Sequence, residues 1–513
     1  MKRLFAVLLC LCMLCSMFSG CKKQLGPHIP TGDGLYNDTT QEPTAPGLSD
    51  QSLTLACYFE KSLNPYTATD FTNRTLLPLM YQGLFSVDRN YQAVPILCKE
   101  YRVSPDMKMY TFYLCAARFS DGTVLTAEDV VASLEAARLG SYYSGRFLHI
   151  LSVTAENGAV VVSLDTPMEN LPLLLDIPIV KAAQVNEPLP LGTGAYVMDD
   201  AISGKRLRRQ AAWWCATDSI ITAPSITLVE AHSASKIRDQ FEFEDVGLVC
   251  ADPGSDSYAD YRCDYELWDC ENGLFLYLVC NKNSPVFSND TVRKALTHAF
   301  DRDYLVETYY RGFASGATLP ASPDSPYYSQ TLASRYGYDS LAFTTALSEA
   351  TLETKEITFI VNSDDSLRLR VGRYLAKVLT DYGLTVNLME VTTSKLAEQL
   401  RWGTYDLYLG QTKLSPNMDL SSFFGRNGNL SYGGLADTTI YALCRESLAN
   451  QGNYYNLHEQ VMEGGWLCPL LVRSYAVYAT RGLLTELNPA RDNVFFYTTG
   501  RTLTDAQLPT VSE

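Results

Sequence analysis

The chain has 513 residues, of which 46% are hydrophobic, and its formal net charge is −16. This length allows several packed units, and the hydrophobic content is sufficient for a sizeable core. The acidic balance argues against a nucleic-acid partner, because phosphate binding needs clustered basic surface.

The first twenty residues have the layout of a secretory signal. Lys2 and Arg3 precede an uncharged run of 15 residues, Leu4 to Phe18. A bilayer-spanning helix needs about 20 apolar residues, so this run is too short to cross comfortably but suits the apolar region of a signal peptide. We therefore predict a signal peptide over residues 1–20 and an extracytoplasmic location.

The segment FSGC, residues 18–21, resembles the bacterial lipobox, in which the cysteine is acylated and becomes the new N-terminus. Two or more acyl chains anchor a protein stably, and Lys22 and Lys23 would each add about 1 kcal/mol at an anionic lipid surface. We predict that Cys21 is the lipidation site and that the membrane is a partner through this anchor. The alternative is an ordinary cleaved signal with an incidental cysteine.

Residues 21–50 are rich in Gly, Pro, Thr and Asp and lack apolar periodicity, so we predict a flexible tether. The packed body should begin just after it, because SLTLACY at residues 52–58 alternates like a strand. A turn-rich loop, NPYTATD, follows at residues 64–70, and apolar residues then recur at helical spacing over residues 75–85.

Ten of the 14 cysteines remain once the signal and the lipidated Cys21 are set apart. None of the ten belongs to a CxxC pair, which argues against a zinc or iron–sulfur site. Ten unpaired thiols outside a cell would suit a reducing or anaerobic niche. The alternative is that some of them, such as Cys263 and Cys270, form disulfides.

A strand followed by a capped helix is expected in the next part of the chain. MYTFYL, residues 109–114, has the composition of a strand. After a polar loop, Thr126 has the position of an N-cap, and Asp129 stands three residues later. The helix that follows should bury one stripe, which contains Val130, Val131, Leu134 and Ala137.

The clearest periodicity lies in the second half of the chain. Strand patterns at residues 357–361, 385–391 and 405–410 alternate with two helical patterns, one capped at Asp364 to Ser366 and ended by Gly383, the other spanning Ser394 to Gly403. This β-α-β-α-β order favours a mainly parallel sheet covered by helices. Ligands bind beyond the carboxyl ends of strands in such sheets, so the segment after residue 410 is a functional candidate.

Sequence signatures of catalysis and of metal binding are absent. None of the five histidines has a metal-ligand spacing, and His458 in HEQVM lacks the second histidine of HExxH, so we expect it on a helix surface. No G-x-S-x-G elbow, Walker loop or GxGxxG occurs, and PLGTGAY at residues 190–196 is interpreted as a tight turn feeding a strand. We therefore predict no enzyme activity, no cofactor and no metal site. The 33 tyrosines and five tryptophans instead suit a cleft that binds ligands of mixed polarity.

Several motifs, taken in chain order, carry a resemblance to a known family. They are RFSDGTVLTAEDV within residues 63–134, PLGTGAYV at residues 190–197 with Trp214 after it, and the helix and glycine turn of residues 281–317. Together they resemble the extracellular solute-binding protein family 5, the oligopeptide-, dipeptide- and nickel-type binding components of ABC importers. The resemblance covers roughly Ser52 to Leu503, and several motifs in family order are more specific than any one of them.

The resemblance implies an α/β fold of the two-lobed periplasmic-binding-protein type, in its type II, large variant. Two hinge strands would join the lobes, lobe I would carry an extra subdomain, and the lobes would close around the ligand. The expected boundaries are residues 51–268 for lobe I with the subdomain at about 76–189, 269–485 for lobe II, and 486–513 for a return to lobe I.

One departure from the family pattern concerns peptide binding. Peptide-binding members carry an aspartate for the ligand's N-terminal amine about nine residues after the position of Asp406, and this chain has Ser415 there. Thr412 replaces the tryptophan that often precedes the amine-binding residue. A buried ammonium is stabilised by a desolvated carboxylate, and Ser415 offers only a neutral hydroxyl. This departure therefore argues against peptide specificity. Asp419 could still meet a cationic group, although it also has the position of an N-cap before LSSFF.

The resemblance implies a lipid-anchored protein that captures a small solute, such as a peptide, for an ABC importer. Its partners would be the solute and the ABC permease subunits, and a monomer is expected. The candidate substrate-binding residues are Asn64 and Tyr66 in the first loop, Gly192, Thr193 and Gly194 in the glycine turn, and Thr412, Ser415 and Asp419.

Two alternatives to transport come from other classes of function. A surface sensor, adhesin or chaperone could keep the same fold and bind a protein partner instead of a small solute. A secreted hydrolase is disfavoured by the missing nucleophile and metal motifs. Permease and ATPase genes beside this gene would favour import, whereas an isolated gene would favour the sensor, adhesin or chaperone.

Overall fold

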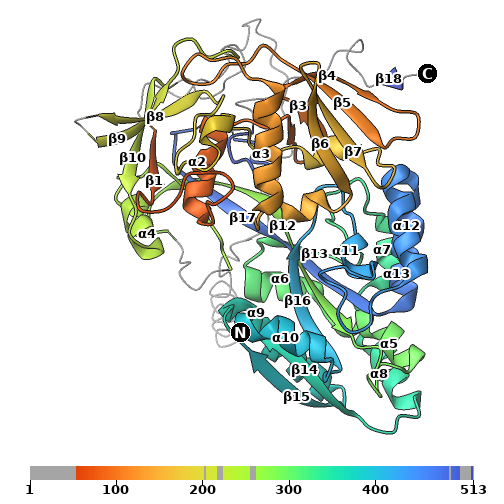
Figure 1. Cartoon of the computed structure of the whole chain (residues 1–513). Coiled ribbons are helices and arrows are strands. Elements are labelled where there is room, and N and C mark those ends of the chain that lie inside the picture. Colours follow the sequence, from red (N-terminus) through yellow and green to blue (C-terminus); the bar gives the residue numbers. More distant parts are fainter. Residues whose placement is uncertain are drawn as a thin grey trace, which may run out of the picture. The chain divides into compact units, whose positions relative to one another are not determined.

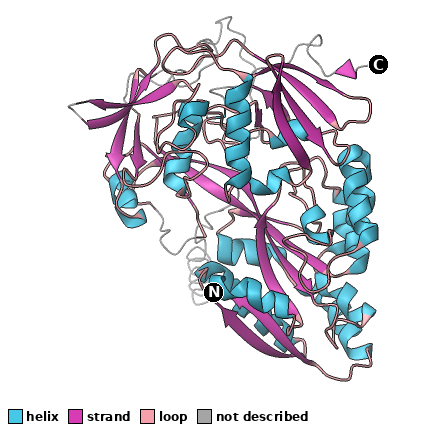
Figure 2. Cartoon of the chain, viewed as in Figure 1, coloured by secondary structure: helices cyan, strands magenta, loops and turns pink. Residues whose placement is uncertain are grey.

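The computed structural model describes most of the chain beyond the expected tether (Figure 1; Figure 2). The predicted signal peptide, Cys21 and the tether lie outside the described residues. Within the described part, no helix is both long and apolar enough to span a bilayer. The described residues are 53–201, 204–215, 223–254, 261–484, 487–496 and 510–511.

Strands and helices occur along the whole described part. The strands are β1 (Thr54–Cys57), β2 (Phe85–Val87), β3 (Ala93–Pro95), β4 (Cys98–Val103), β5 (Met109–Leu114), β6 (Ile150–Glu156), β7 (Ala159–Leu164), β8 (Tyr196–Ala201), β9 (Gly204–Arg209), β10 (Ser225–Glu230), β11 (Leu248–Ala251), β12 (Tyr265–Cys280), β13 (Ala314–Gly316), β14 (Glu356–Asn362), β15 (Thr385–Val391), β16 (Leu407–Lys413), β17 (Leu467–Thr480) and β18 (Thr510–Val511). The helices are α2 (Phe71–Met80), α3 (Ala127–Leu139), α4 (Ala234–Glu242), α5 (Asp290–Ala295), α6 (Arg302–Tyr310), α7 (Gln330–Ala333), α8 (Ser340–Glu349), α9 (Ser366–Asp381), α10 (Thr393–Trp402), α11 (Ser421–Phe424), α12 (Thr438–Ala449) and α13 (Tyr454–Gly464).

The largest sheet has 11 strands, and two of them are much longer than the others. Its order is β15-β14-β16-β12-β17-β11-β1-β10-β9-β8, with β13 paired to β17. β12 and β17 pair antiparallel over almost their whole length, from Tyr265 opposite Thr480 to Val279 opposite Leu467. β16 joins one end of this pair (Figure 1), and β11 joins the other end, so β12 and β17 are the two expected hinge strands.

Lobe I is the part built around β1, β8 to β11 and a second sheet of order β18-β4-β5-β7-β6. Its core brings Leu76 of α2 together with Val130 and Leu134 of α3, all of them fully buried. The chain returns to this core near its end, because Val494 and Phe495 pack in the same cluster.

Lobe II contains β13 to β16 and helices α5 to α13. β14 pairs parallel with both β15 and β16, as the β-α-β-α-β order predicts, whereas β12 joins β16 in the antiparallel direction. Helix α9 begins where the Asp365 side chain accepts the backbone N–H of Arg368, and it buries Leu367, Val371 and Leu375. The residue numbers of the lobe boundaries given above stay a prediction.

Local sequence signals placed several elements correctly. MYTFYL is β5, and Thr126 and Asp129 form a capping box at the start of α3. The helix expected over residues 75–85 instead spans 71–80. It starts earlier because the Asp70 side chain accepts two backbone N–H groups, and it ends because Tyr81 adopts an extended conformation.

Two other expectations need correction. His458 lies in helix α13, but it is fully buried rather than exposed on the helix surface. Helical spacing explains this, since His458 lies on the same buried side of α13 as Leu457, Val461 and Met462. Cys263 and Cys270 are both free thiols, so the disulfide considered for them does not form.

Candidate functional site

A cavity of about 200 Å³ lies between the lobes, and both lobes contribute to its wall. Arg74 reaches it from α2 of lobe I, and Lys413 reaches it from the carboxyl end of β16 in lobe II. Asn272 lines it from hinge strand β12, and Arg491 and Asp492 line it from the returning segment. We call this space the interlobe cavity. Its position at the end of β16 agrees with the place expected for a ligand in a parallel sheet.

Asp492 is the meeting point of cationic side chains from both lobes. Its carboxylate pairs with the ammonium of Lys413 and lies 3.2 Å from Nη2 of Arg146. The hydroxyl of Tyr142 also donates to Asp492, at 2.7 Å, and accepts a hydrogen bond from Lys413, at 2.7 Å. Arg146 has a second carboxylate partner in Asp176.

Arg74 is fixed beside this group by contacts of its own. Its Nη1 donates to the carbonyl oxygen of Ala68 at 3.0 Å, and its Nη2 donates to the hydroxyl of Tyr143 at 3.0 Å. Its guanidinium lies 3.3 Å from the ring centroid of Tyr142, a cation–π arrangement. Arg74 therefore keeps its charge at the cavity wall without a carboxylate bonded to it.

Cations outnumber carboxylates in this group of buried and half-buried side chains. We call the group the Asp492 cluster. It contains Arg74, Arg146, Lys413, Arg491, Asp176 and Asp492. Four positive charges thus face two negative charges, and a dry site with uncompensated cations favours a bound anion.

The pKa values in the cluster reflect this imbalance. Burial lowers the pKa of Lys413 to about 8, although the attraction of Asp492 opposes that shift. Burial alone would raise the pKa of Asp492, but Lys413, Arg491 and Arg146 outweigh it and hold that pKa well below its usual range. Glu271 adds little negative charge at neutral pH, because burial raises its pKa to about 8.

Arg491 has hydrogen-bond donors to spare. One of its nitrogens, Nη2, donates to the carbonyl of Leu414, but its buried Nε and Nη1 atoms form no hydrogen bond. Its nearest carboxylate oxygen, on Asp492, is 3.5 Å from Nε. Gly273 on β12 makes room for this side chain, since a Cβ atom there would lie 2.5 Å from the Arg491 guanidinium carbon. The glycine also has a φ of +73°, which L-residues with side chains rarely adopt.

The candidate residues Asn64 and Tyr66 lie away from the interlobe cavity. The amide of Asn64 donates to the carbonyls of Val185 and Glu187, both at 2.8 Å, and its oxygen accepts the backbone N–H of Tyr66. The hydroxyl of Tyr66 donates to the carbonyl of Pro178 at 2.7 Å. These contacts hold the first loop onto the rest of lobe I, and ligand contact by either residue stays a prediction.

The candidate glycine turn packs against the end of helix α2. A Cβ atom on Gly192 would lie 2.2 Å from the carbonyl oxygen of Met80, and one on Gly194 would lie 2.4 Å from its carbonyl carbon. Thr193 is fully buried, and its carbonyl accepts the indole N–H of Trp213 at 2.8 Å. Close backbone packing explains the two glycines, and ligand contact by the turn stays a prediction.

The third candidate group follows β16. Thr412 is paired with Phe275 of β12, the carbonyl of Ser415 accepts the backbone N–H of Met418, and neither residue lines the interlobe cavity. Asp419 accepts the backbone N–H of Ser421 at 2.9 Å, and its other oxygen lies 3.3 Å from Nε2 of His149 in lobe I. Asp419 thus already has a side-chain partner within the protein itself.

The residues that do line the cavity were not singled out from the sequence, apart from the general region after residue 410. Arg74 is the only one of them with a sequence feature that could have indicated a functional role, because it is a charged residue inside a helical segment with buried leucines. Arg491 and Asp492 lie in a stretch without any motif, and only the fold brings them to Lys413. In the described residues, no group of three His, Cys, Asp or Glu side chains could hold a metal ion.

Comparison with solved structures shows the fold. The ABC transporter substrate-binding protein CtaP of Listeria monocytogenes superposes with a TM-score of 0.70 and 17% identity, covering 87% of this chain and 97% of that one. NikA of Brucella suis, in complex with Fe(III)-EDTA, superposes with a TM-score of 0.70 and 18% identity, covering 88% of this chain and 100% of that one. The predicted two-lobed α/β fold of the type II binding proteins is therefore confirmed.

Sequence comparison shows the family. The glutathione-binding protein GsiB of Pectobacterium atrosepticum is 26% identical over 289 residues, which cover 52% of this chain and 55% of that protein. The chain thus spans about half the length of the curated relatives it matches. Residues 92–431, more than half of the chain, match the family model described as bacterial extracellular solute-binding proteins, family 5 Middle. The chain belongs to this family of solute-binding proteins, whose members are binding proteins rather than enzymes.

Proposed function

We propose that this protein captures a small solute carrying an anionic group, such as a carboxylate, between its lobes and delivers it to an ABC importer. The observation that carries the proposal is the surplus of positive charge around the interlobe cavity. Arg74 and Lys413 line that cavity from opposite lobes, so a bound anion would contact both of them. A ligand that touches both lobes favours the closed state, because it has more contacts there than in the open state.

The unpaired donors of Arg491 support an oxygen-rich ligand group. A guanidinium presents its N–H groups in a planar fork that matches a carboxylate. Arg491 is nearly fully buried, so its free Nε and Nη1 atoms gain more from a ligand oxygen than exposed donors would. An anion would also supply the negative charge that the Asp492 cluster lacks.

Capture of a peptide amine at Asp419 is not part of this proposal. The carboxylate of Asp419 is almost fully buried and already has His149 as its partner. A ligand ammonium would have to displace the imidazole of His149 from Asp419. His149 would then keep Asp165 as its carboxylate partner. The similar proteins bind glutathione or an Fe(III)-EDTA complex according to their names, which supports a solute with carboxylate groups.

The direct test is a binding screen on the purified protein. Carboxylate-bearing solutes, including short peptides and metal chelates, should raise the melting temperature. A ligand at a concentration of 100 times its dissociation constant stabilises the folded state by about 2.7 kcal/mol. Amides of the same solutes, which lack the charge, should not raise the melting temperature. Stabilisation by cationic solutes alone would contradict the proposal, and native mass spectrometry of protein from its own host would identify a carried ligand.

The anchoring and the partners are part of the same proposal. Acylated Cys21 would hold the protein at the outer face of the cell membrane, and the permease subunits of the importer would receive the solute from a monomer. Replacing Cys21 by alanine should release the protein from membranes into the soluble fraction. Retention of the Cys21→Ala variant in the membrane would contradict the lipid anchor, while solute binding by the same variant should be unchanged.

A further inference from the structure

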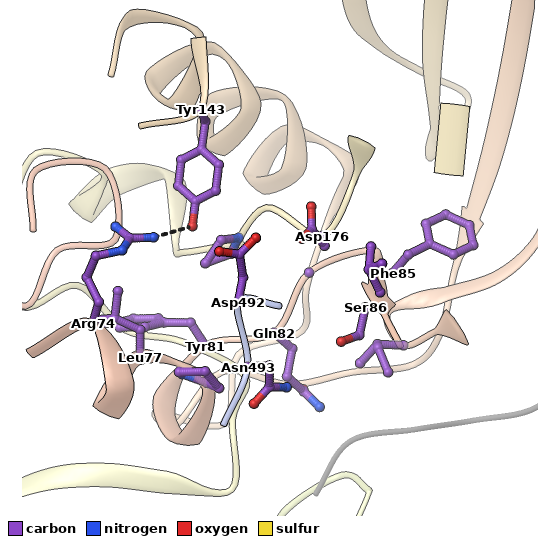
Figure 3. A pocket seen from close by; sticks show the side chains of 15 residues that line it. Arg74, Leu77, Tyr81, Gln82, Phe85, Ser86, Tyr143, Asp176, Asp492 and Asn493 are labelled. Atoms are coloured by element: carbon purple, nitrogen blue, oxygen red, sulfur yellow. Dashed lines mark hydrogen bonds between the residues drawn. The ribbon is translucent and has the colours of Figure 1, made fainter. Parts of the chain in front are cut away.

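A second, smaller cavity of about 60 Å³ lies in lobe I, and Figure 3 shows the side chains that line it. Arg74 and Asp492 line both cavities, so the two spaces meet at the Asp492 cluster. Its size is enough for several waters or for one compact polar group of a ligand. We call it the lobe I cavity.

Gln82 supplies the lobe I cavity with an unpartnered donor. The residue is 3% exposed and lines the cavity. Its Oε1 accepts the indole N–H of Trp214 at 3.0 Å, and an indole N–H can only donate. This contact fixes the orientation of the amide, so the remaining atom is the NH₂ group, Nε2, which is buried and has no hydrogen-bond partner.

A buried donor without an acceptor loses its hydration without compensation. The carboxylates nearby do not fill this role, because Asp176 is paired with Arg146 and Asp492 is paired with Lys413. The rest of the wall is partly apolar, with Leu77, Phe85 and Ile96. Nε2 of Gln82 therefore lacks an acceptor, and a carbonyl oxygen of a compact ligand group would supply one.

We infer that the lobe I cavity is a ligand subsite in which Gln82 donates to a carbonyl oxygen of the solute. The inference rests on the proposed function, because the anionic group of the same solute would occupy the Asp492 cluster. It defines a narrower substrate class: carboxylates that carry a second, uncharged carbonyl oxygen a few bonds away. Gln82 would then be a specificity-determining residue, and Arg74 would contact both parts of the solute.

Matched pairs of simple acids test the subsite directly. 4-Oxopentanoate and pentanoate differ by one carbonyl group, as do 5-oxohexanoate and hexanoate. The two pairs test two different separations between the carboxylate, which would bind at the Asp492 cluster, and the carbonyl group. In calorimetric or NMR titrations at pH 7, the protein should bind the oxo acid of at least one pair about fivefold to tenfold more tightly than its parent acid. Gln82→Leu should reduce that ratio to about one.

Two further variants separate a subsite from a general disturbance of lobe I. Gln240→Leu is the matched control, because Gln240 is also a buried glutamine with one unpartnered polar atom, but it lies in α4 away from both cavities. It should leave the ratio unchanged. Gln82→Glu keeps the size of the side chain but adds a negative charge, so it should weaken binding of both acids of a pair. Trp214 retains the carbonyl of Thr193 as an acceptor at 3.2 Å in either Gln82 variant, which favours correct folding.

The possible outcomes distinguish this inference from the proposed function. Equal binding of oxo acids and parent acids by the wild type, or an unchanged ratio in Gln82→Leu, would overturn the subsite and leave anion binding intact. Binding of none of the four acids by the wild type would overturn both. A crystal structure with the preferred oxo acid should show its carbonyl oxygen at Nε2 of Gln82, and finding only water there would refute the inference.

Discussion

Two contacts between the lobes use the same kinds of side chain with opposite results. At the Asp492 cluster, four cations share two carboxylates and buried donors are left over. We call the other the His149 contact. There, one ring nitrogen of His149 lies 2.9 Å from Asp165, and the other lies 3.3 Å from Asp419 and 3.1 Å from the Ser421 hydroxyl.

The difference distinguishes a site whose charges and donors lack partners, and which can therefore bind a ligand, from a contact whose polar groups already have partners inside the protein. Each nitrogen of His149 has a partner inside the protein, and burial is outweighed by Asp419 and Asp165, so the pKa of His149 lies above its ordinary value. The Asp492 cluster keeps a cavity and free donors at a cost in stability that a ligand can recover. Unmatched buried charge, rather than charge as such, therefore marks the candidate site.

The largest expected effect comes from removing the only shared counter-charge of the cluster. Asp492→Asn leaves Lys413 and Arg146 facing each other across the lobes and should lower the free energy of unfolding by about 3–5 kcal/mol, as measured by urea denaturation. Asp199→Asn is the control, because Asp199 pairs with Arg206 at the surface and should cost less than about 1 kcal/mol. Similar losses for both variants would remove the distinction between the cluster and ordinary ion pairs.

The His149 contact should contribute less, and its contribution should depend on pH. The folded-state pKa of His149 is raised, so the stabilisation is complete below the unfolded value of about 6.5 and is lost as pH rises through the folded value. We expect His149→Gln to lower the free energy of unfolding by about 1.5–3 kcal/mol at pH 5.5–6 and by less at pH 8.5.

A double-mutant cycle with Asp419→Asn assigns that pH dependence to the pair. The asparagine oxygen can still accept the backbone N–H of Ser421, so the start of α11 is preserved. The coupling energy between the two substitutions should shrink as pH rises. A coupling that is independent of pH would show that the imidazole is not charged in this contact.

Binding at the Asp492 cluster should respond to pH in a different range. Lys413 loses its proton as pH rises through about 8, so affinity for a carboxylate such as 4-oxopentanoate should fall above that pH, by up to about tenfold per unit. Lys413→Met should bind more weakly at pH 7 and show a flatter profile between pH 7 and 9. A wild-type profile that is flat over this range would exclude Lys413 from the anion site.

The smallest effect is expected at the exposed edge of the His149 contact. Arg445 of α12 donates to the carbonyl of Asp165 at 3.2 Å, in an exposed position. Arg445→Ala should change the free energy of unfolding by less than about 1 kcal/mol and leave its pH dependence unaltered. A larger or pH-dependent loss would mean that Asp165, rather than Asp419, dominates the His149 contact.

Much of the fold could be predicted from the sequence, but little of the site. The capping box at Thr126 and the parallel strands of lobe II follow from local patterns, because caps and apolar periodicity act over a few residues. His458 shows the limit of this reasoning, since its burial depends on what packs over α13. The candidate glycine turn shows another limit: its glycines are explained by the backbone of α2, more than a hundred residues earlier.

The sequence by itself determined several strands and helices, the family resemblance and the resemblance of residues 18–21 to a lipobox, because each depends on neighbouring residues. Only the tertiary structure decided which charges meet. Arg74 is hundreds of residues away from Lys413 and Asp492, and the latter two lie on different lobes. No pattern in the sequence around any of the three predicts that they meet. Electrostatic attraction acts through space, so the surplus of cations, and the free donor of Gln82 beside it, exist only once the chain has folded.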